Sequence, residues 1–341
     1  MQRILSLATL VVLGGLAWVF LRDNPPGSPG ERPPANQRPT FGGALGDLWS
    51  QSGGGSAPPS PGDATPSFAG GPTLRIATYH IQSFGEQKAS QPHVMHTLAE
   101  IVRRFDVVAI QGIRTRDDYH MGNFIRLVNQ GGRRYDTLVG RRVGNTTETE
   151  QYAFVFDEER VKLDFGTYYT LRDPENLLHR EPLVATFRAR GVPDNQAFTF
   201  TLVNVHADAQ AVGDELDVLA EVYRVVRRAG GNEDDVIMLG AFQADDKHLG
   251  RLGQIPGVAP LVSGVAANTH KNKLLTNLVI HQPSTTEYVG RSGVFDVMRE
   301  FNLTLDQALM VSDQLPVWAQ FSAYERDYAG RIATRQGVVV R

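Results

Sequence analysis

The stretch LRIATYHIQSFGE, residues 74–86, carries most of the information about the fold. Its first part, residues 74–81, is rich in β-branched and aromatic side chains, as buried strands are. Further segments share this composition and are separated by short polar turns, so we expect strands also at 106–113, 135–143, 151–157, 182–190, 197–207, 235–242 and 276–282. Two stretches, 93–105 and 215–228, repeat apolar residues at helical spacing and are predicted to be helices, the second capped by Asp214.

The overall composition is that of an ordinary globular protein. Of 341 residues, 41% are hydrophobic and 21% are charged, with a formal net charge of −3. This near balance argues against a nucleic-acid binder that works through a bulk positive field. The absence of cysteine excludes disulfides, thiolate catalysis and cysteine-ligated metal sites. Strands dominate and helices intervene, so we expect one α/β (α+β) domain at 73–341, a sandwich of two sheets with helices outside.

Two further segments precede this domain. Residues 4–21 carry no charge and are long enough to cross a hydrocarbon core of about 30 Å, so we expect a signal anchor, a transmembrane helix, at 1–22. A cleaved signal peptide is the alternative, although no small-residue cleavage site follows. Residues 23–72 hold 11 Pro and 11 Gly and are predicted to be a disordered linker. Within it, residues 41–49 are either a docking motif or an incidental apolar patch.

The charges at the start of the chain indicate an orientation. The amino terminus and Arg3 favour the cytosolic side, which would place the domain on the outer side, periplasmic or extracellular. Cleavage of the segment would instead make the domain secreted. Residues 322–341 suggest no function.

Seven motifs occur in one order along the predicted domain. They are LRIATYHIQSFGE (74–86), FDVVAIQGIR (105–114), VGNTTETEQY (143–152), REP (180–182), VHA (205–207), MLGAFQA (238–244) and VSDQLPV (311–317). Together they resemble the endonuclease/exonuclease/phosphatase superfamily, and its deoxyribonuclease I-like members in particular, over roughly 73–322. The resemblance implies a four-layer α/β/β/α sandwich of two mainly antiparallel sheets, with an active site where loops of both sheets meet. It also implies metal-assisted phosphodiester hydrolysis, in which Mg²⁺ takes carboxylate and amide oxygens as ligands.

Many positions that carry this chemistry in the family are substituted. The family's asparagine at the end of the first strand is a histidine here, its metal-binding glutamate is a glycine, and the aspartate and asparagine of its Gly-Asp-Phe-Asn motif are alanine and glutamine. A further aspartate and the final histidine are also replaced. In order, these positions are His80, Gly112, Ala241, Gln243, Thr276 and Gln314.

Other family positions survive. The resemblance implies that His206 is a catalytic histidine and that Glu150 is its carboxylate partner, a remnant pair. Asp313 stands at a metal-site or phosphate-site aspartate, and Arg114 and Arg180 stand at positions that contact phosphate and substrate. Without the resemblance, a partly buried hydrogen-bonded pair is the preferred interpretation of His206 and Glu150. The two arginines are equally well interpreted as partners in structural salt bridges, for example with Glu181.

Glycine and alanine offer no ligand or acid–base group, and the loss of one such group typically slows a reaction by ~10²–10⁴-fold. We therefore predict a pseudo-nuclease that has lost Mg²⁺-dependent hydrolysis and needs no cofactor, with Mg²⁺ or another divalent metal relevant only to residual activity. The alternative is an active phosphodiesterase or endonuclease with a remodelled site that uses His206 and Glu150. His80, His206 and Asp313 are a speculative ligand set for a transition metal.

The expected partners follow from these alternatives. Arg114 and Arg180 suit a nucleic acid or another phosphate ligand, a protein partner is the other candidate, and the first segment would bind a membrane. We expect the domain itself to be monomeric.

Overall fold

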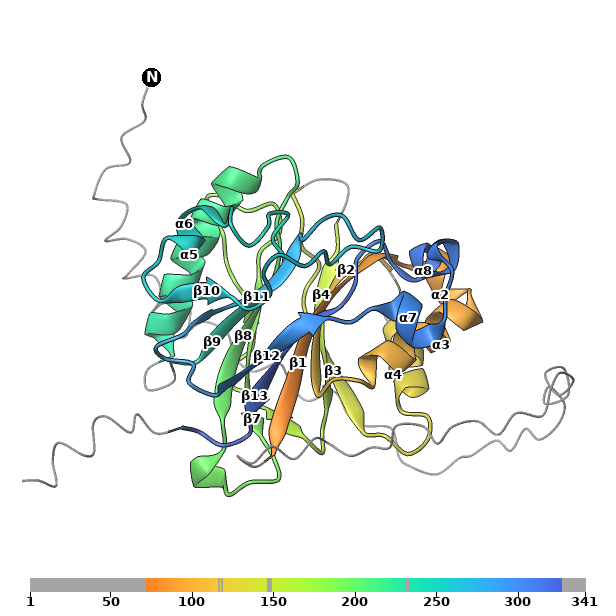
Figure 1. The fold of residues 1–341 in the computed structure, drawn as a ribbon, viewed down its shortest axis with the longest axis horizontal. Helices are drawn as coiled ribbons and strands as arrows, with labels where there is room; N and C mark the ends of the chain where they lie inside the picture. Colours follow the sequence, from red (N-terminus) through yellow and green to blue (C-terminus); the bar gives the residue numbers. More distant parts are fainter. Residues whose placement is uncertain (1–71, 116, 118, 146–148, 231–233, 327–341) are drawn as a thin grey trace, which may run out of the picture. The chain divides into compact units, whose positions relative to one another are not determined.

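The computed structural model describes residues 72–326 except 116, 118, 146–148 and 231–233. The predicted anchor at 1–22 and the segment 41–49 therefore lie outside the described residues, as do the rest of the linker up to residue 71 and the tail at 327–341. Within the described ranges, none of the helices combines the length and the apolar character needed to span a bilayer. The described residues form an α/β sandwich of two mixed sheets (Figure 1).

The first sheet contains the stretch at 74–86. Its strands, in spatial order, are β12 (Tyr288–Val294), β13 (Val317–Ser322), β1 (Thr73–Phe84), β2 (Val107–Ile113), β4 (Gln151–Asp157) and β3 (Tyr135–Val139). Neighbours are antiparallel apart from β1 and β2, which run parallel. A parallel pair needs a long crossover, and α3 (Pro92–Val102) lies within this one.

The second sheet has the same plan. Its strands, in spatial order, are β10 (Val258–Pro260), β11 (Thr276–His281), β9 (Val236–Ala241), β8 (Thr199–His206), β7 (Leu183–Ala189) and β5 (Val161–Leu163), with β6 (Tyr169–Thr170) also paired to β7. Here β8 and β9 are the parallel pair, and α5 (Val212–Ala229) lies in the crossover between them.

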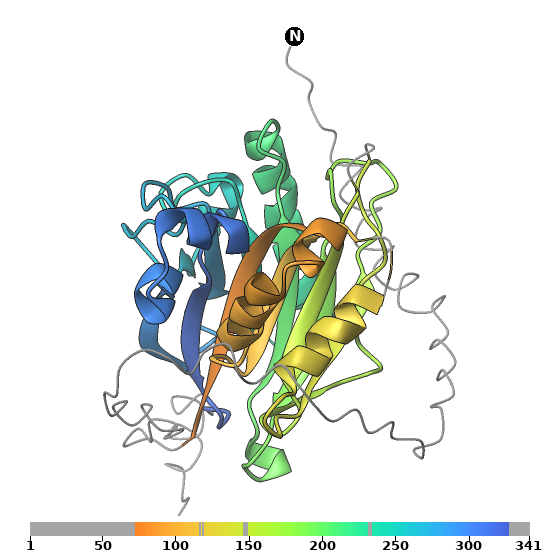
Figure 2. The same ribbon diagram turned by 90° about the vertical axis from the view of Figure 1, so that its right-hand side faces the viewer.

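Three apolar layers hold the sandwich together. The largest lies between the sheets and includes Phe154, Phe187 and Phe200. The second packs the outer face of the first sheet against α3, α4 (Tyr119–Val128), α7 (Val297–Phe301) and α8 (Leu305–Val311). The third packs the second sheet against α5 and α6 (Gly250–Gly253). Figure 2 shows α3 in orange and α4 in yellow covering the first sheet, with the green α5 on the far side. The short elements left are α2 (Glu86–Ala89) and the 3₁₀ turn Asp194–Gln196.

The two-sheet sandwich expected from the sequence is confirmed, and each predicted strand segment contains a strand. The predicted cap at Asp214 is wrong, because α5 begins at Val212 and its N-cap is Ala211. The neighbouring acidic residue in the first turn of α5, Glu215, holds two loops instead. Glu215 accepts hydrogen bonds from the backbone amides of His179 and Asp208, on loops outside the helix.

Candidate functional site

The motif residues from both sheets meet at one end of the sandwich. His80 lies near the end of β1 and pairs in register with Gln111, next to Gly112 in β2. In the second sheet, His206 at the end of β8 is in register with Ala241. Ala241 is in turn opposite Thr276 at the start of β11. Since the parallel strands of each sheet end here, residues of both sheets lie close together, and the rings of His80 and His206 have centroids 4.6 Å apart.

The predicted pair of His206 and Glu150 is present. His206 Nδ1 lies 2.7 Å from Glu150 Oε1, and the residues are 8% and 1% exposed. Glu150 is fixed by reciprocal backbone hydrogen bonds with Val143, just before β4 begins. Its second oxygen, Oε2, lies 3.4 Å from Nε of Arg180, so a buried chain runs from Arg180 through Glu150 to His206.

The contacts from Arg180 through Glu150 to His206 determine which of these groups carry a proton. Burial raises the pKa of Glu150, but the charge and hydrogen bond of His206 and the charge of Arg180 outweigh burial and lower the pKa to about 2. Burial lowers the pKa of His206, and the carboxylate of Glu150 opposes this shift. The ionised carboxylate can only accept, so Nδ1 of His206 carries the proton. Nε2 of His206 faces the side-chain amide nitrogen of Gln243 at 3.4 Å, which suits the neutral imidazole because an amide nitrogen only donates.

Several positions that carry the family's site chemistry offer no charged oxygen here. Gly112 has φ of +83°, and a Cβ atom there would lie 2.4 Å from the carbonyl oxygen of Ile81. A side chain at residue 112 is therefore excluded by the backbone as it stands. Ala241 offers no ligand atom, and Thr276 Oγ1 and Gln314 Oε1 are buried without a hydrogen-bond partner among the described residues. These neutral groups do not fit Mg²⁺, which prefers several charged oxygens.

A second contact between a histidine and a carboxylate lies beside the first pair. His80 Nδ1 is 3.8 Å from Asp313 Oδ1, and the rings of His80 and His206 have centroids 4.6 Å apart. Burial raises the pKa of Asp313, but the charges of His80 and Lys88 outweigh burial and lower the pKa overall. His80, His206 and Asp313 are not among the described groups of three ligand atoms within 4.8 Å of one another. The geometry therefore gives the speculative transition-metal site no support.

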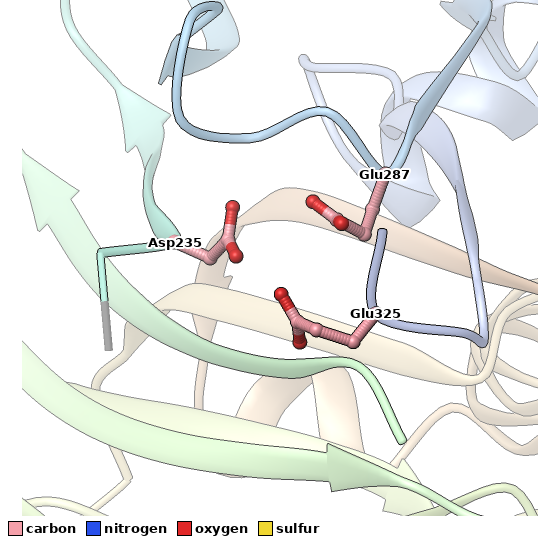
Figure 3. Close-up of side chains that lie close together, drawn as sticks. All are labelled: Asp235, Glu287 and Glu325. Atoms are coloured by element: carbon pink, nitrogen blue, oxygen red, sulfur yellow. The ribbon is translucent and has the colours of Figure 1, made fainter. Parts of the chain in front are cut away.

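The described part of the chain has such a group elsewhere. Asp235 precedes β9, Glu287 precedes β12 and Glu325 follows β13, and one ligand atom from each lies within 4.8 Å of the others. Figure 3 shows the three carboxylates pointing toward one another. They lie at the opposite ends of β9 and β13 from Ala241 and Gln314, so they take no part in the site around His206.

The two predicted phosphate-contact arginines differ in their surroundings. Arg180 has a side chain that is 9% exposed and is paired with Glu150, whereas Glu181 pairs with Arg141 at 2.6 Å. Arg114 follows β2, is half-buried, and donates its backbone amide to the carbonyl of Phe84. Arg180 is thus built into the site, but its charge is already offset by a carboxylate.

Sequence reasoning missed the residues that hold these side chains in place. Glu215 binds the amides of His179 and Asp208, which adjoin Arg180 and follow His206. Ser312 binds the carbonyl of His80 from between α8 and β13. The role of Glu215 could have been suspected from the sequence. It directly precedes Leu216 in a helix whose other buried residues are apolar, and a buried glutamate needs hydrogen-bond partners. Nothing local could identify Ser312, because its partner is 232 residues away.

Comparison with known proteins gives relatives along most of the chain. Deoxyribonuclease gamma of Rattus norvegicus is 29% identical over 262 residues, covering 72% of this chain and 83% of that protein. Deoxyribonuclease-1 of Sus scrofa is 29% identical over 260 residues, covering 72% and 90%. No family model matches the sequence.

Solved structures show the same fold at low identity. A humanized TDP2 of D. rerio has a TM-score of 0.52 and 14% identity, covering 73% of this chain and 99% of that one. A truncated TDP2 of Caenorhabditis elegans has a TM-score of 0.52 and 12% identity, covering 74% and 98%.

Proposed function

Because the chain belongs to the endonuclease/exonuclease/phosphatase superfamily and is deoxyribonuclease I-like within it, we propose that it is a pseudo-nuclease that binds a phosphate-containing ligand. This superfamily is typically metal-dependent. The proposal is that Mg²⁺-dependent hydrolysis of phosphodiesters has been lost, while the cleft still accepts a phosphate group without a metal ion.

One observation carries the loss of hydrolysis. Residue 112, the position of a metal-binding glutamate by resemblance, has a left-handed backbone whose Cβ direction is blocked by the Ile81 carbonyl. This is more than the exchange of one side chain, because the strand itself no longer has room for a carboxylate. Ala241 and Thr276 extend the deficit to the second sheet, so ligands are lacking on both sides of the cleft.

The surviving groups support binding. The cleft keeps two imidazoles, the amide of Gln243 and the guanidinium of Arg180. Glu150 is neutralised by Arg180, and three positions that would carry carboxylates are Gly112, Ala241 and Thr276. A phosphate anion therefore meets hydrogen-bond donors without a ring of negative charge.

The test is cleavage of a supercoiled plasmid by the purified full chain with Mg²⁺, Ca²⁺ or Mn²⁺. We expect the native chain to cleave the plasmid no faster than a His206→Gln variant prepared in the same way. Cleavage that grows with protein and metal concentration, and that disappears in His206→Gln, would overturn the proposal.

That same outcome would support a second candidate, an active phosphodiesterase with a remodelled site. The observation in its favour is the intact pair of His206 and Glu150, with a neutral imidazole whose proton lies on Nδ1. Such an imidazole can accept a proton at Nε2, as a general base must. Binding of a protein partner is the further alternative, favoured if the chain binds no polyanion.

We also propose that the domain is tethered to a membrane by the apolar segment 4–21 and lies on its outer side as a monomer. Extraction of cell membranes with alkaline carbonate should leave the full chain in the membrane fraction. Release into the soluble fraction, or a mature amino terminus beyond residue 22, would instead favour a cleaved signal peptide and a secreted protein.

A further inference from the structure

His80 is held near the end of β1 by a serine from a distant part of the chain. Ser312 Oγ donates to the His80 carbonyl at 2.8 Å and accepts from the Gln82 amide at 3.1 Å. Ser312 is 1% exposed and lies between α8 and β13. This clamp acts where the pairing of β1 with β2 shifts register. The histidine therefore projects from a fixed backbone.

The imidazole of His80 faces the space beside Gly112. A Cβ atom on residue 112 would lie 3.2 Å from Nε2 of His80. Because residue 112 has no side chain, no Cβ atom fills the position next to that nitrogen. The glycine thus leaves room for the imidazole of His80, a side chain that is 14% exposed.

The other ring nitrogen faces a carboxylate. His80 Nδ1 is 3.8 Å from Asp313 Oδ1, and their side chains are 14% and 36% exposed. Asp313 Oδ1 is a buried atom without a hydrogen-bond partner among the described residues. A buried polar atom in this condition marks a place where water or a ligand completes the contacts. The side chains of this contact are also more exposed than those of His206 and Glu150, which are 9% and 1% exposed.

The charges around the two imidazoles nearly cancel. Arg180 offsets Glu150 on the His206 side. Lys88 acts on Asp313 on the His80 side, from α2, where its Nζ donates to the carbonyls of Met310 and Val311 at the end of α8. The two rings lie 4.6 Å apart, and because His206 keeps its proton on Nδ1, His80 supplies the imidazole donor of this region. Such a region suits an anion with several oxygens.

We propose that His80 and Asp313 form a second histidine–carboxylate pair, in which His80 binds a phosphate group without a metal ion. The inference rests on the proposed function and names the residues that carry it. A phosphate oxygen accepts Nε2–H of His80, while the Asp313 carboxylate faces Nδ1 and fixes the ring. His80 makes the contact, and Asp313 is a positioning residue.

The experiment is calorimetric titration of the full chain with sodium phosphate in the presence of EDTA. His80→Asn is expected to weaken binding by at least about tenfold, the effect of losing one charge-assisted hydrogen bond. His96→Asn, on the exposed face of α3, is the matched control and should bind as the native chain does. Phosphate should also shift the imidazole NMR resonances of His80, which a purely structural role would not produce.

The outcomes separate this inference from the proposed function. Equal affinity of His80→Asn and the native chain would overturn the role of His80 and leave the pseudo-nuclease proposal intact. Native binding that EDTA abolishes would overturn metal-free binding, and no native binding at all would overturn both phosphate claims. If His80→Asn fails to fold, Asp313→Asn serves instead, with weaker binding and an altered His80 resonance expected and unchanged values contradicting the inference.

Discussion

At the scale of single residues, Gly112 has the strictest requirement. Its φ of +83° and the 2.4 Å from a built Cβ to Ile81 oxygen leave glycine as the residue that fits. We expect Gly112→Ala to lower the free energy of unfolding by at least about 2 kcal/mol, since a left-handed backbone alone costs a residue with a Cβ about 1–2 kcal/mol. Urea unfolding measures this. Gly122→Ala in α4 is the control, because nothing lies within 4 Å of its Cβ position, and alanine favours a helix. Equal stability of Gly112→Ala and the native chain would contradict the account.

Glu150 is the second residue with a sharp expectation. Because its pKa is lowered to about 2, it contributes stability that is fully present above the ordinary value of 4.5 and is lost as the pH falls from 4.5 toward 2. Glu150→Gln leaves Arg180 buried without its charge partner, so we expect a loss of about 3 kcal/mol at pH 7. Urea unfolding at pH 7 and pH 3 should show the difference shrinking at the lower pH. Glu181→Gln, in a more exposed pair with Arg141, should change stability by less than about 1 kcal/mol.

The sequence was sufficient to pair His206 with Glu150, because the resemblance supplied both positions. It could not pair Arg180 with Glu150 or place Ser312 against His80, since these contacts join segments that are distant along the chain. The backbone conformation of Gly112 was equally out of reach, because a glycine in a strand motif does not disclose its φ.

At the scale of elements, the loop between α8 and β13 positions the cleft. Ser312 ties this loop to β1, and Thr269 Oγ1 donates to the Ser312 carbonyl at 2.6 Å. Ser312→Ala removes the hydrogen bonds of the buried Ser312 hydroxyl with the His80 carbonyl and the Gln82 amide, so we expect a loss of about 1–3 kcal/mol in urea unfolding. Ser90→Ala at the exposed end of α2 should stay within about 0.5 kcal/mol. An equal effect of both substitutions would contradict the clamp.

The strands that sequence patterns identified are those with long apolar runs, such as β1, β2 and β8. The pattern did not identify β12, whose residues are half-buried or exposed and include two glycines. It also did not identify β13, whose polar Gln320 is buried against Thr73. Both strands complete the first sheet beside β1, so tertiary pairing rather than composition determines them.

At the scale of the whole described domain, a group of three carboxylates lies between ends of the two sheets, at the opposite ends of β9 and β13 from Ala241 and Gln314. The group consists of Asp235, Glu287 and Glu325. Burial and the charge of Glu287 raise the pKa of Glu325 to about 7. The folded state therefore holds a proton that the unfolded state loses near 4.5, so stability falls as the pH rises from 4.5 to about 7. We expect the stability of Glu325→Gln to decrease less over this pH range than that of the native chain. Its melting temperature at pH 8 should therefore be higher. Melting curves between pH 5 and pH 8 that are parallel for the two proteins would contradict this.

The central claim is that the cleft no longer supports metal-dependent hydrolysis. Its most direct test is the initial rate of plasmid cleavage by the full chain, measured at rising Mg²⁺ and Mn²⁺ concentrations beside His206→Gln. The account predicts that both proteins give the same rate at every metal concentration, equal to that of the plasmid alone. A rate that rises with metal and protein in the native chain, and is absent in His206→Gln, would contradict it.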